Sequence, residues 1–393
     1  MAMETYSLII NLGSASKKYA LYNGRELIVS YHLEKRAADY IITTMKTGSL
    51  VAAPLLKDEY VQSLTFILHL LTKVEGVLKK HIKSVAIRVV APGAYFAEHR
   101  NIGATFIAHL EKEASLDPLH ILPTVHTIKE VEKHLPKVPL FAISDSAFHT
   151  TIDKKEYALP FAKEDIEHFD LTPYGYHGIS LESLVQKIPT LFSTPPQKIV
   201  VCHLGGGSSV TALLAQKSIH TSMIYSPLGG VVMSSRSGSV DPGALLTLMQ
   251  KKKMTVQNTL HYLYSESGMR GISGITGDTP RLLELEQQGD PNAKNALLHF
   301  TRSITEEIAK QIVSLKGIDA IIFTGTIGER SPVIRERIIT HLSFLPVALD
   351  TTKNNVAIHE DALINTSQSK IHIATLTTNE MESMATILQT LSA

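Results

Sequence analysis

The apolar positions in the first part of the chain follow the period of β-strands. Residues 8–10 form an unbroken apolar run typical of a buried strand, small residues at 11–16 predict a turn, and residues 19–21 predict the returning strand. Asn23-Gly24 indicates a second tight turn, which leads into a strand at 26–32. The chain is therefore expected to begin as an antiparallel meander.

Helical and strand patterns alternate through the rest of the chain. Apolar residues spaced three and four apart predict helices at 60–80, 105–113, 128–134, 293–316 and 379–391. Short apolar runs predict strands at 83–90, 138–143, 319–324 and 371–376. Asp278 and Asp290, each followed closely by proline, indicate acidic helix N-caps. The glycine-rich segment 325–330 predicts a turn between a strand and a helix.

Two stretches share one layout and suggest candidate chemistry. Residues 8–21 and 199–214 each read as an apolar run, a Gly/Ser tip and a second apolar run. Most such tips only turn the chain, but they also leave backbone N–H groups uncovered, and the first is followed by Lys18. Two copies so far apart in the chain suggest two related halves that bind a shared phosphate.

Composition narrows the class of protein. A chain of 393 residues is long enough for two domains, and the mixed, charged stretch at 151–168 predicts the passage between them. A net charge of +1 argues against nucleic acid or an anionic membrane as partner. The single cysteine, Cys202, fits a reducing compartment, and neither a signal peptide nor a membrane-spanning run is evident. Histidines lack the spacing of a transition-metal site. We expect a cytoplasmic protein.

A series of motifs, in order along nearly the whole chain, resembles the acetate and propionate kinases of the acetokinase family. The motifs are NLGSASKKYAL, IRVV, DPLH, SDSAFHTTI, YGYHGIS, CHLGGGSSVTAL, TSMIYSPLGG, SRSGSVDPG, SGMRGISGITGD, IIFTGTIGERSPVIRERI and TTNE. The resemblance implies an α/β protein of two actin-like ATPase domains, with duplicated cores and an interdomain active-site cleft. The expected domains are residues 1–150, completed by 379–393, and residues 151–378. Family members are typically homodimers.

The resemblance also implies which residues act in catalysis. Arg88 and Arg236 match the two active-site arginines, whose guanidinium groups suit a carboxylate and a phosphoryl group. His177 matches the histidine that hydrogen-bonds the transferring phosphoryl oxygens. Asp145 and Glu380 match carboxylates that organise Mg²⁺, which Mn²⁺ could replace.

Further positions follow from the same match. Asn11 corresponds to the asparagine near the metal and the transferring group. Residues implied to hold the phosphates of ATP are Ser14, Ser16, Lys18, His203, Gly205 and Gly207. Residues implied to hold the nucleoside are Asp278, Gly325, Ile327, Gly328 and Glu329. The small acyl pocket is implied to be formed by Val90, Leu119, Tyr176 and Pro227.

Several positions depart from the family's usual residues. They are Ala91-Pro92, Leu181, Gly206, Gly229, Ser234-Ser235, Arg281 and Thr326. Thr326 places a β-branched side chain where backbone commonly lies near the nucleoside, so the choice of nucleotide is open. All the residues matched to catalysis and metal binding are retained, which argues against an inactive scaffold.

The expected reaction is Mg²⁺-dependent, direct in-line phosphoryl transfer from ATP to a short-chain carboxylate, giving ADP and an acyl phosphate. Such an acid is already ionised near neutral pH, so Asp145 is expected to position metal rather than to act as a general base. Acetate is the expected acid. Propionate or another small acid, a different phosphoryl donor, a sugar substrate and a nucleotide-binding regulator without transfer remain alternatives.

Overall fold

The computed structural model describes residues 5–13, 16–36, 39–46, 48–114, 118–155 and 157–392. The chain divides into two compact units. Unit 1 comprises residues 1–147, 178–183 and 379–393, and unit 2 comprises residues 148–177 and 184–378. No helix in the described ranges is both long and apolar enough to cross a membrane.

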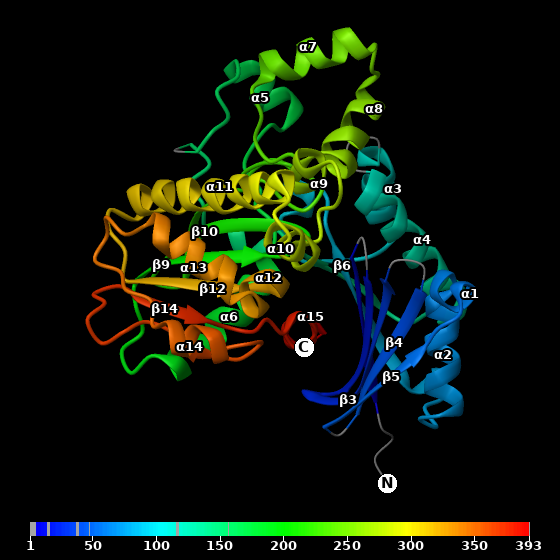
Figure 1. Cartoon of the computed structure of the whole chain (residues 1–393). Helices are drawn as coiled ribbons and strands as arrows, with labels where there is room; N and C mark the ends of the chain where they lie inside the picture. The colour runs from blue at the N-terminus through cyan, green and yellow to red at the C-terminus, as the bar shows by residue number, and fades with distance from the viewer. Residues whose placement is uncertain are drawn as a thin grey trace. The chain divides into compact units, whose positions relative to one another are not determined.

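Unit 1 is built on one mixed sheet of eight strands (Figure 1). Its strands are β1 (Tyr6–Leu12), β2 (Ser16–Asn23), β3 (Glu26–Arg36), β4 (Asp39–Lys46), β5 (Ser49–Pro54), β6 (Ile82–Val89), β7 (Arg100–Asn101) and β8 (Leu140–Ser144). They lie in the order β5-β4-β3-β2-β1-β6-β8-β7. Strands β1 to β5 form the expected antiparallel meander, whereas β1, β6 and β8 run parallel. The carboxyl ends of these three parallel strands therefore share one edge.

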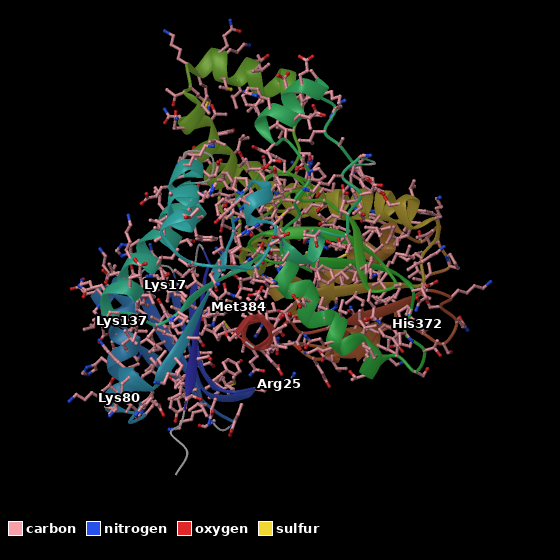
Figure 2. The ribbon with its side chains drawn as sticks, turned by 180° about the vertical axis from the view of Figure 1, so that it is seen from behind. Lys17, Arg25, Lys80, Lys137, His372 and Met384 are labelled. Atoms are coloured by element: carbon pink, nitrogen blue, oxygen red, sulfur yellow. The ribbon has the colours of Figure 1, made fainter. Side chains whose placement is uncertain are left out.

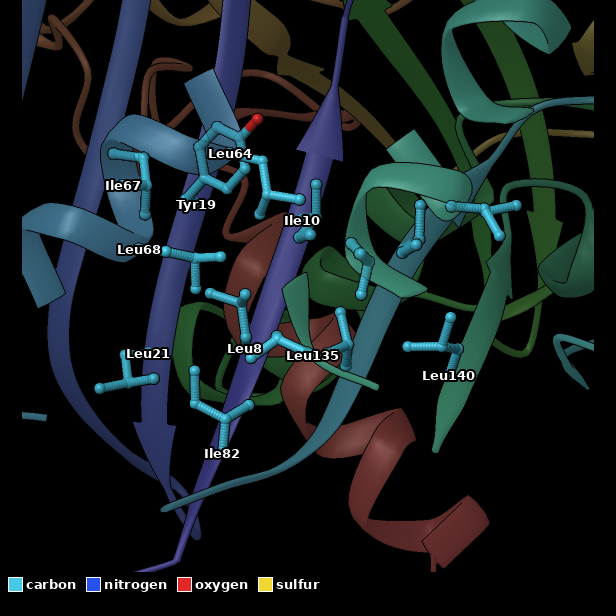
Figure 3. Close-up of a cluster of buried hydrophobic side chains, with 14 of the residues drawn as sticks. Leu8, Ile10, Tyr19, Leu21, Leu64, Ile67, Leu68, Ile82, Leu135 and Leu140 are labelled. Carbon is cyan, nitrogen blue, oxygen red and sulfur yellow. The ribbon is translucent and has the colours of Figure 1, made fainter. Parts of the chain in front are cut away.

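The helices of unit 1 cover both faces of this sheet. They are α1 (Lys57–Val61), α2 (Ser63–Lys73), α3 (Ala104–Glu113), α4 (Pro118–His134) and α15 (Glu380–Ser392), with 3₁₀ turns at Lys79–His81 and Ala94–Phe96. Figure 3 shows Leu8, Ile10 and Tyr19 of the sheet clustered with Leu64 and Ile67 of α2.

Alternate residues of the same strands form a second apolar layer. Ile9, Ala20 and Ala86 pack with Met384 of α15, which is labelled in Figure 2. Because neighbouring residues of a strand point to opposite faces, α2 and α15 lie on opposite sides of the sheet. The face on which any other residue of these strands lies therefore follows from its spacing from these apolar residues.

Unit 2 repeats the strand order of unit 1. Its strands are β9 (Lys198–Leu204), β10 (Ser208–Leu214), β11 (Lys217–Thr221), β12 (Ala320–Thr324), β13 (Ala362–Leu363) and β14 (His372–Thr375). They lie in the order β11-β10-β9-β12-β14-β13. As in β3-β2-β1-β6-β8-β7, two hairpins lead into three parallel strands and a short antiparallel edge strand. The two related halves predicted from the repeated hairpin are present.

Helices surround the sheet of unit 2, and the longest, α11, packs against β9 and β10 (Figure 1). The helices are α5 (Lys163–Phe169), α7 (Pro242–Lys252), α8 (Val256–His261), α9 (Gly268–Ser273), α10 (Thr279–Gln287), α11 (Pro291–Leu315), α12 (Gly325–Arg330), α13 (Pro332–His341) and α14 (Thr351–Val356). A π-helical turn occupies Tyr262–Glu266, a 3₁₀ turn Ala147–His149 spans the passage from unit 1, and α6 (Gly178–Leu191) begins in unit 1 and continues in unit 2. The predicted acidic caps are confirmed, since Asp278 and Asp290 accept N–H bonds at the starts of α10 and α11.

Three local predictions were wrong in detail. The single helix expected at 60–80 is interrupted at Gln62 and ends at Lys73, and Gly76 then adopts a φ of 70° that a helix does not contain. The helical pattern at 128–134 is only the end of α4, which begins at Pro118. The turn expected at 11–16 begins later, because β1 continues to Leu12 and Asn11 pairs with Lys18 within the sheet.

The glycine-rich segment after β12 also differs from its prediction. Residues 325–330 form the short helix α12 rather than an open turn. The carboxylate of Glu329 accepts the N–H of Gly325 at 3.1 Å, which satisfies a donor at the helix start. This local bond gives the segment a reason to close into a helical turn.

Candidate active site

Unit 1 places three of the predicted residues on one face at one end of its sheet. Asn11, Arg88 and Asp145 each follow, by two residues, an apolar residue of the layer that packs on α15: Ile9, Ala86 and Ile143. Because side chains two apart in a strand share a face, and β1, β6 and β8 are parallel neighbours, the three polar side chains converge.

These side chains form a connected network. Arg88 donates two bonds to the Asp145 carboxylate, from Nε to Oδ1 at 3.2 Å and from Nη2 to Oδ2 at 2.9 Å. Its Nη1 donates to Asn11 Oδ1 at 3.3 Å, and Asn11 Nδ2 donates to Glu380 Oε2 at 2.7 Å. Asp145 is 1% exposed and Arg88 only 14%, so the pair is largely removed from water.

The charge of this cluster is uneven. Burial acts to lower the pKa of Arg88, but the charges of Asp145 and Glu380, with the Asp145 hydrogen bonds, outweigh it and raise that pKa. Arg88 therefore stays protonated beside two carboxylates. The cluster carries one more negative charge than positive, which favours the approach of a cation.

The donors present fit a magnesium ion. Mg²⁺ takes one or two protein carboxylates and completes its shell with water and phosphate oxygens, and Asp145, Glu380 and the Asn11 amide oxygen are hard oxygen donors. Among the residues that the structure describes, no group of three or more His, Cys, Asp or Glu side chains could enclose a metal. The arrangement suits a metal shared with a substrate rather than a closed protein cage.

The first hairpin tip is closed by the N–H of Gly13, which donates to the carbonyl of Ser16 at 2.8 Å. Ser14 lies outside the described residues. Lys18 is the cross-strand partner of Asn11 and therefore shares its face, two residues from Ser16. By contrast, Lys17 (Figure 2) points the other way and donates to the carbonyl of Tyr60 at 2.7 Å. The alternation leaves Lys18 on the side of the polar cluster.

Unit 2 holds a second group of predicted residues around the tip between β9 and β10. His177 adopts a left-handed conformation with φ 63° directly before α6, and its ring stacks on His203 with centroids 4.2 Å apart. Its Nδ1 hydrogen-bonds Ser209 Oγ at 2.9 Å. Ser209 pairs with His203 across the hairpin, so both side chains are on the face that His177 covers.

Arg236 and His177 both approach Gly207 at this tip. A Cβ atom on Gly207 would lie 3.3 Å from Arg236 Nη1 and 3.4 Å from His177 Nε2. Arg236 Nη1 also donates to the Pro227 carbonyl at 3.4 Å, and its guanidinium lies 5.5 Å from the ring centroid of Tyr264. The structure thus brings together Gly207, His177 and Arg236, three positions identified separately in the sequence.

Two glycines explain how the loop that bears Arg236 is held. A Cβ on Gly268 would lie 2.6 Å from the Arg236 carbonyl oxygen, and one on Gly277 would lie 2.0 Å from the Ser234 carbonyl oxygen. Gly268 also has a φ of 62°. Only glycine leaves room for the backbone to pass this close to the segment that carries Arg236.

The residues predicted to hold the nucleoside lie along the short helix α12 and at the N-cap of α10. Gly325, Ile327, Gly328 and Glu329 belong to α12, and a Cβ on Gly325 would lie 2.7 Å from the Leu204 carbonyl, so α12 begins beside the β9–β10 tip. The Glu329 side chain is occupied by internal hydrogen bonds rather than directed outward. Asp278 is exposed and caps α10.

The predicted acyl-pocket residues come from both units. Val90 is buried immediately after β6, and Leu119 lies in α4 with a side chain outside the described residues. In unit 2, Tyr176 is 1% exposed and its hydroxyl donates to the Tyr225 carbonyl at 2.8 Å. The extra hydroxyl of this tyrosine is therefore satisfied internally. Pro227 is buried, and its carbonyl accepts the Arg236 bond.

Two supporting residues were not identified from the sequence. Ser209 lies within the CHLGGGSSVTAL motif, and its register opposite His203 is the signal that could have assigned it. His359, whose Nδ1 lies 2.6 Å from Glu329 Oε2, belongs to no motif and is brought there only by the tertiary fold.

Known proteins are similar to this chain in sequence and in fold. The acetate kinase of Bacillus cereus is 34% identical over 380 residues, which are 95% of each chain. The acetate kinase structure from Porphyromonas gingivalis matches with a TM-score of 0.82 at 26% identity, over 99% of this chain and 100% of that one.

The propionate kinase structure from Francisella tularensis matches with a TM-score of 0.84 at 28% identity, over 97% and 98% of the two chains. These matches confirm the predicted α/β fold class. A model of the Acetokinase family covers residues 6–386, and the chain belongs to the Acetokinase family.

Proposed function

We propose that the chain transfers the γ-phosphoryl group of ATP to acetate in a reversible reaction that yields ADP and acetyl phosphate. The observation that carries the proposal is the connected cluster of Asn11, Arg88, Asp145 and Glu380 at the carboxyl ends of three parallel strands. Family membership and relatives named acetate kinase support the same reaction.

Electrostatics is the main task of such a site. A carboxylate acceptor is anionic near neutral pH and is repelled by the phosphates of ATP, so positive charge must surround both. We assign Arg88 to the acetate carboxylate and Arg236 to the transferring group, with Nε2 of His177 as a further donor. The hydrogen bond between Ser209 Oγ and His177 Nδ1 holds the imidazole ring in its orientation. Because phosphoryl transfer passes through a loose transition state, it depends on alignment and charge stabilisation more than on covalent catalysis by the protein.

Mg²⁺ is the proposed metal, held by Asp145 and Glu380 with support from Asn11, and Mn²⁺ is expected to substitute. When bound, it would neutralise phosphate charge as a Lewis acid. Asp145 remains hydrogen-bonded to Arg88, which keeps its oxygens oriented. Removal of divalent ions with EDTA should stop turnover, and added Mg²⁺ should restore it.

The phosphates of ATP are assigned to Ser16, Lys18, His203, Gly205 and Gly207, together with Ser14, and the nucleoside to Asp278 and α12. We also propose that residues 1–150, completed by 379–393, form an N-terminal actin-like domain, and that residues 151–378 form a C-terminal actin-like domain with the nucleotide site. Val90, Leu119, Tyr176 and Pro227 are assigned to the acyl group. One methylene in such a pocket changes binding by only about 1–3 kcal/mol, so propionate should also react.

A coupled assay of ADP release with acetate, propionate and butyrate tests the proposal. Acetate-dependent turnover supports it, and preference for propionate would reassign the acid. ADP release that is independent of every acid, or no release at all, would contradict it and favour a nucleotide-binding regulator.

Arg236→Ala gives a sharper test of the assigned roles. Loss of a positive charge at the transferring group should lower kcat by at least about a hundredfold, with the circular dichroism spectrum unchanged. Arg302→Ala is the matched control, because Arg302 is 71% exposed on α11 and pairs with Glu306 in the same helix. Near-normal kcat in the Arg236 variant would refute its role.

A homodimer is the proposed assembly, and the cytoplasm, which supplies ATP, is the proposed location. Helices α5 and α7 of unit 2 (Figure 1) contain no buried residue. The side chains of Phe161, Phe169 and Leu246 are each at least 60% exposed. Such apolar exposure is typical of an interaction surface. Light scattering should give a mass twice that of one chain, and a monomer would refute the assembly.

A further inference from the structure

We propose that Glu329 and His359 are positioning residues that couple the start of α12 to the segment carrying Glu380. The inference rests on the proposed function, because it assigns the nucleoside to α12 and the metal to Glu380. It adds a connection between these two sites that passes through one buried carboxylate and the backbone of Thr378.

Glu329 is 4% exposed, and both oxygen atoms of its carboxylate have hydrogen-bonding or ion-pair partners. Its Oε1 accepts the N–H of Gly325 at 3.1 Å and the N–H of Thr378 at 3.1 Å. The hydroxyls of Thr324 and Thr378 lie 3.4 Å from the same oxygen. A single oxygen atom therefore joins the first residue of α12 to a segment 53 positions later in the chain.

Thr378 lies at the boundary between the two units of the chain. It is the last residue of unit 2 before the chain enters unit 1, and only Asn379 separates it from Glu380. Consecutive Cα atoms are about 3.8 Å apart, so the fixed N–H of Thr378 limits where the backbone of Glu380 can start. A change at α12 that moves Glu329 would thus be passed to the metal carboxylate through two peptide units.

His359 holds the other oxygen of the same carboxylate. Its Nδ1 lies 2.6 Å from Glu329 Oε2, and its backbone N–H donates to the Glu329 carbonyl at 2.9 Å. His359 has a positive φ of 54°, which is uncommon for a residue with a side chain. The imidazole thus orients the buried carboxylate so that Oε1 faces the two backbone N–H groups.

These contacts argue for positioning rather than for direct binding of the nucleoside by Glu329. A buried carboxylate is costly unless its oxygens are satisfied, and here they are satisfied within unit 2. A purely structural role would stabilise the fold without linking the two sites. The two possibilities differ in what happens to nucleotide and metal binding when the carboxylate is removed.

The test compares Glu329→Ala, Glu329→Gln and His359→Ala with Glu307→Ala in the full chain. Glu307 is a matched control because it is equally buried, pairs with Lys310 and Gln311 on α11, and has no assigned role. The first readout is the Kd of ADP in EDTA, measured by calorimetry. The second is the free Mg²⁺ concentration that gives half-maximal turnover at saturating ATP and acetate.

Glu329→Ala should weaken ADP binding and raise the Mg²⁺ requirement, each by about tenfold, from loss of a charged hydrogen-bond acceptor. Glu329→Gln should recover most of both, to within about threefold, because its amide oxygen still accepts from the two N–H groups. His359→Ala, at a half-exposed position that leaves the core intact, should move both in the same direction by about threefold. Glu307→Ala should change only the melting temperature.

The inference is overturned if Glu329→Ala and His359→Ala leave both readouts at wild-type values, or shift one without the other. If Glu329→Ala does not fold, His359→Ala decides alone, and wild-type values of both readouts in that variant overturn the inference. Failure of the proposed function has a different signature, because wild-type protein would then show no acetate-dependent ADP formation at any Mg²⁺ concentration.

Discussion

Replacing Arg88 by alanine should reveal how strongly the buried cluster of unit 1 depends on one positive charge. The substitution removes both bonds to Asp145, at 3.2 and 2.9 Å, and leaves a carboxylate that is only 1% exposed. Breaking a buried pair by removing one partner typically costs about 3–5 kcal/mol. The variant can limit this cost by protonating Asp145.

Protonation of Asp145 limits how much stability Arg88→Ala can lose, and the cost of that protonation depends on pH. Holding a carboxyl of ordinary pKa, about 3.9, in its neutral form costs about 4 kcal/mol at pH 7 and about 1.5 kcal/mol at pH 5. In Arg88→Ala the folded state favours the protonated carboxyl, so its stability falls as pH rises. We therefore expect a loss of about 3–4 kcal/mol at pH 7 and at most about 1.5 kcal/mol at pH 5.

Urea denaturation at both pH values, followed by fluorescence and circular dichroism, measures these losses. Arg88→Ala combined with Asp145→Asn should remove the pH dependence but not restore turnover, which separates the structural from the catalytic role of Arg88. Arg302→Ala provides the control for loss of an exposed arginine. A loss below about 1 kcal/mol at pH 7, or an equal loss at both pH values, would show that the folded state does not depend on the charge of Arg88 beside Asp145.

Two further predictions concern unit 2. Gly207→Ala would place a methyl group 3.3 Å from Arg236 Nη1 and 3.4 Å from His177 Nε2, and should lower kcat by about tenfold or more. In the control Gly206→Ala, the added methyl group would meet no atom within 4 Å, and kcat should stay within about twofold of wild type. Equal kcat values for the two variants would contradict close packing of Gly207 against Arg236 and His177. Burial opposes ionisation of Asp361, but hydrogen bonds from Thr377 and the Lys187 charge outweigh it and lower its pKa below 3.8. Its stabilising contribution is thus complete above pH 3.8 and lost as pH falls further, so wild type should lose its stability advantage over Asp361→Asn below about pH 4 in acid titrations followed by circular dichroism; a constant difference down to pH 2 would contradict this.

Much of the fold was predictable because apolar periodicity reports local structure. The strand that ends before Asp145, the repeated hairpins and the acidic caps at Asp278 and Asp290 all follow from short-range patterns. The same patterns were misleading at 60–80 and 325–330. There, the conformation of Gly76 and the hydrogen bond that Gly325 N–H donates to Glu329 decide where helices end and begin, and periodicity does not record either.

The candidate site was predictable in its residues but not in its connections. Asn11, Arg88 and Asp145 could be picked out by resemblance, and each follows its strand's apolar positions at even spacing. Their hydrogen-bond partners depend on which strands become neighbours, a property of topology that a single sequence does not display. His359 is the clearest case, because nothing near it in the sequence indicates that it contacts Glu329.

³¹P NMR of the reaction mixture shows directly whether this chain makes acetyl phosphate. Purified protein with ATP, acetate and Mg²⁺ should give an acetyl phosphate resonance that grows with the ADP resonances and that hydroxylamine removes. The resonance should be absent without acetate, in EDTA and with Arg236→Ala. ADP accompanied only by inorganic phosphate, or no change in the ATP resonances over hours with active protein, would contradict the account.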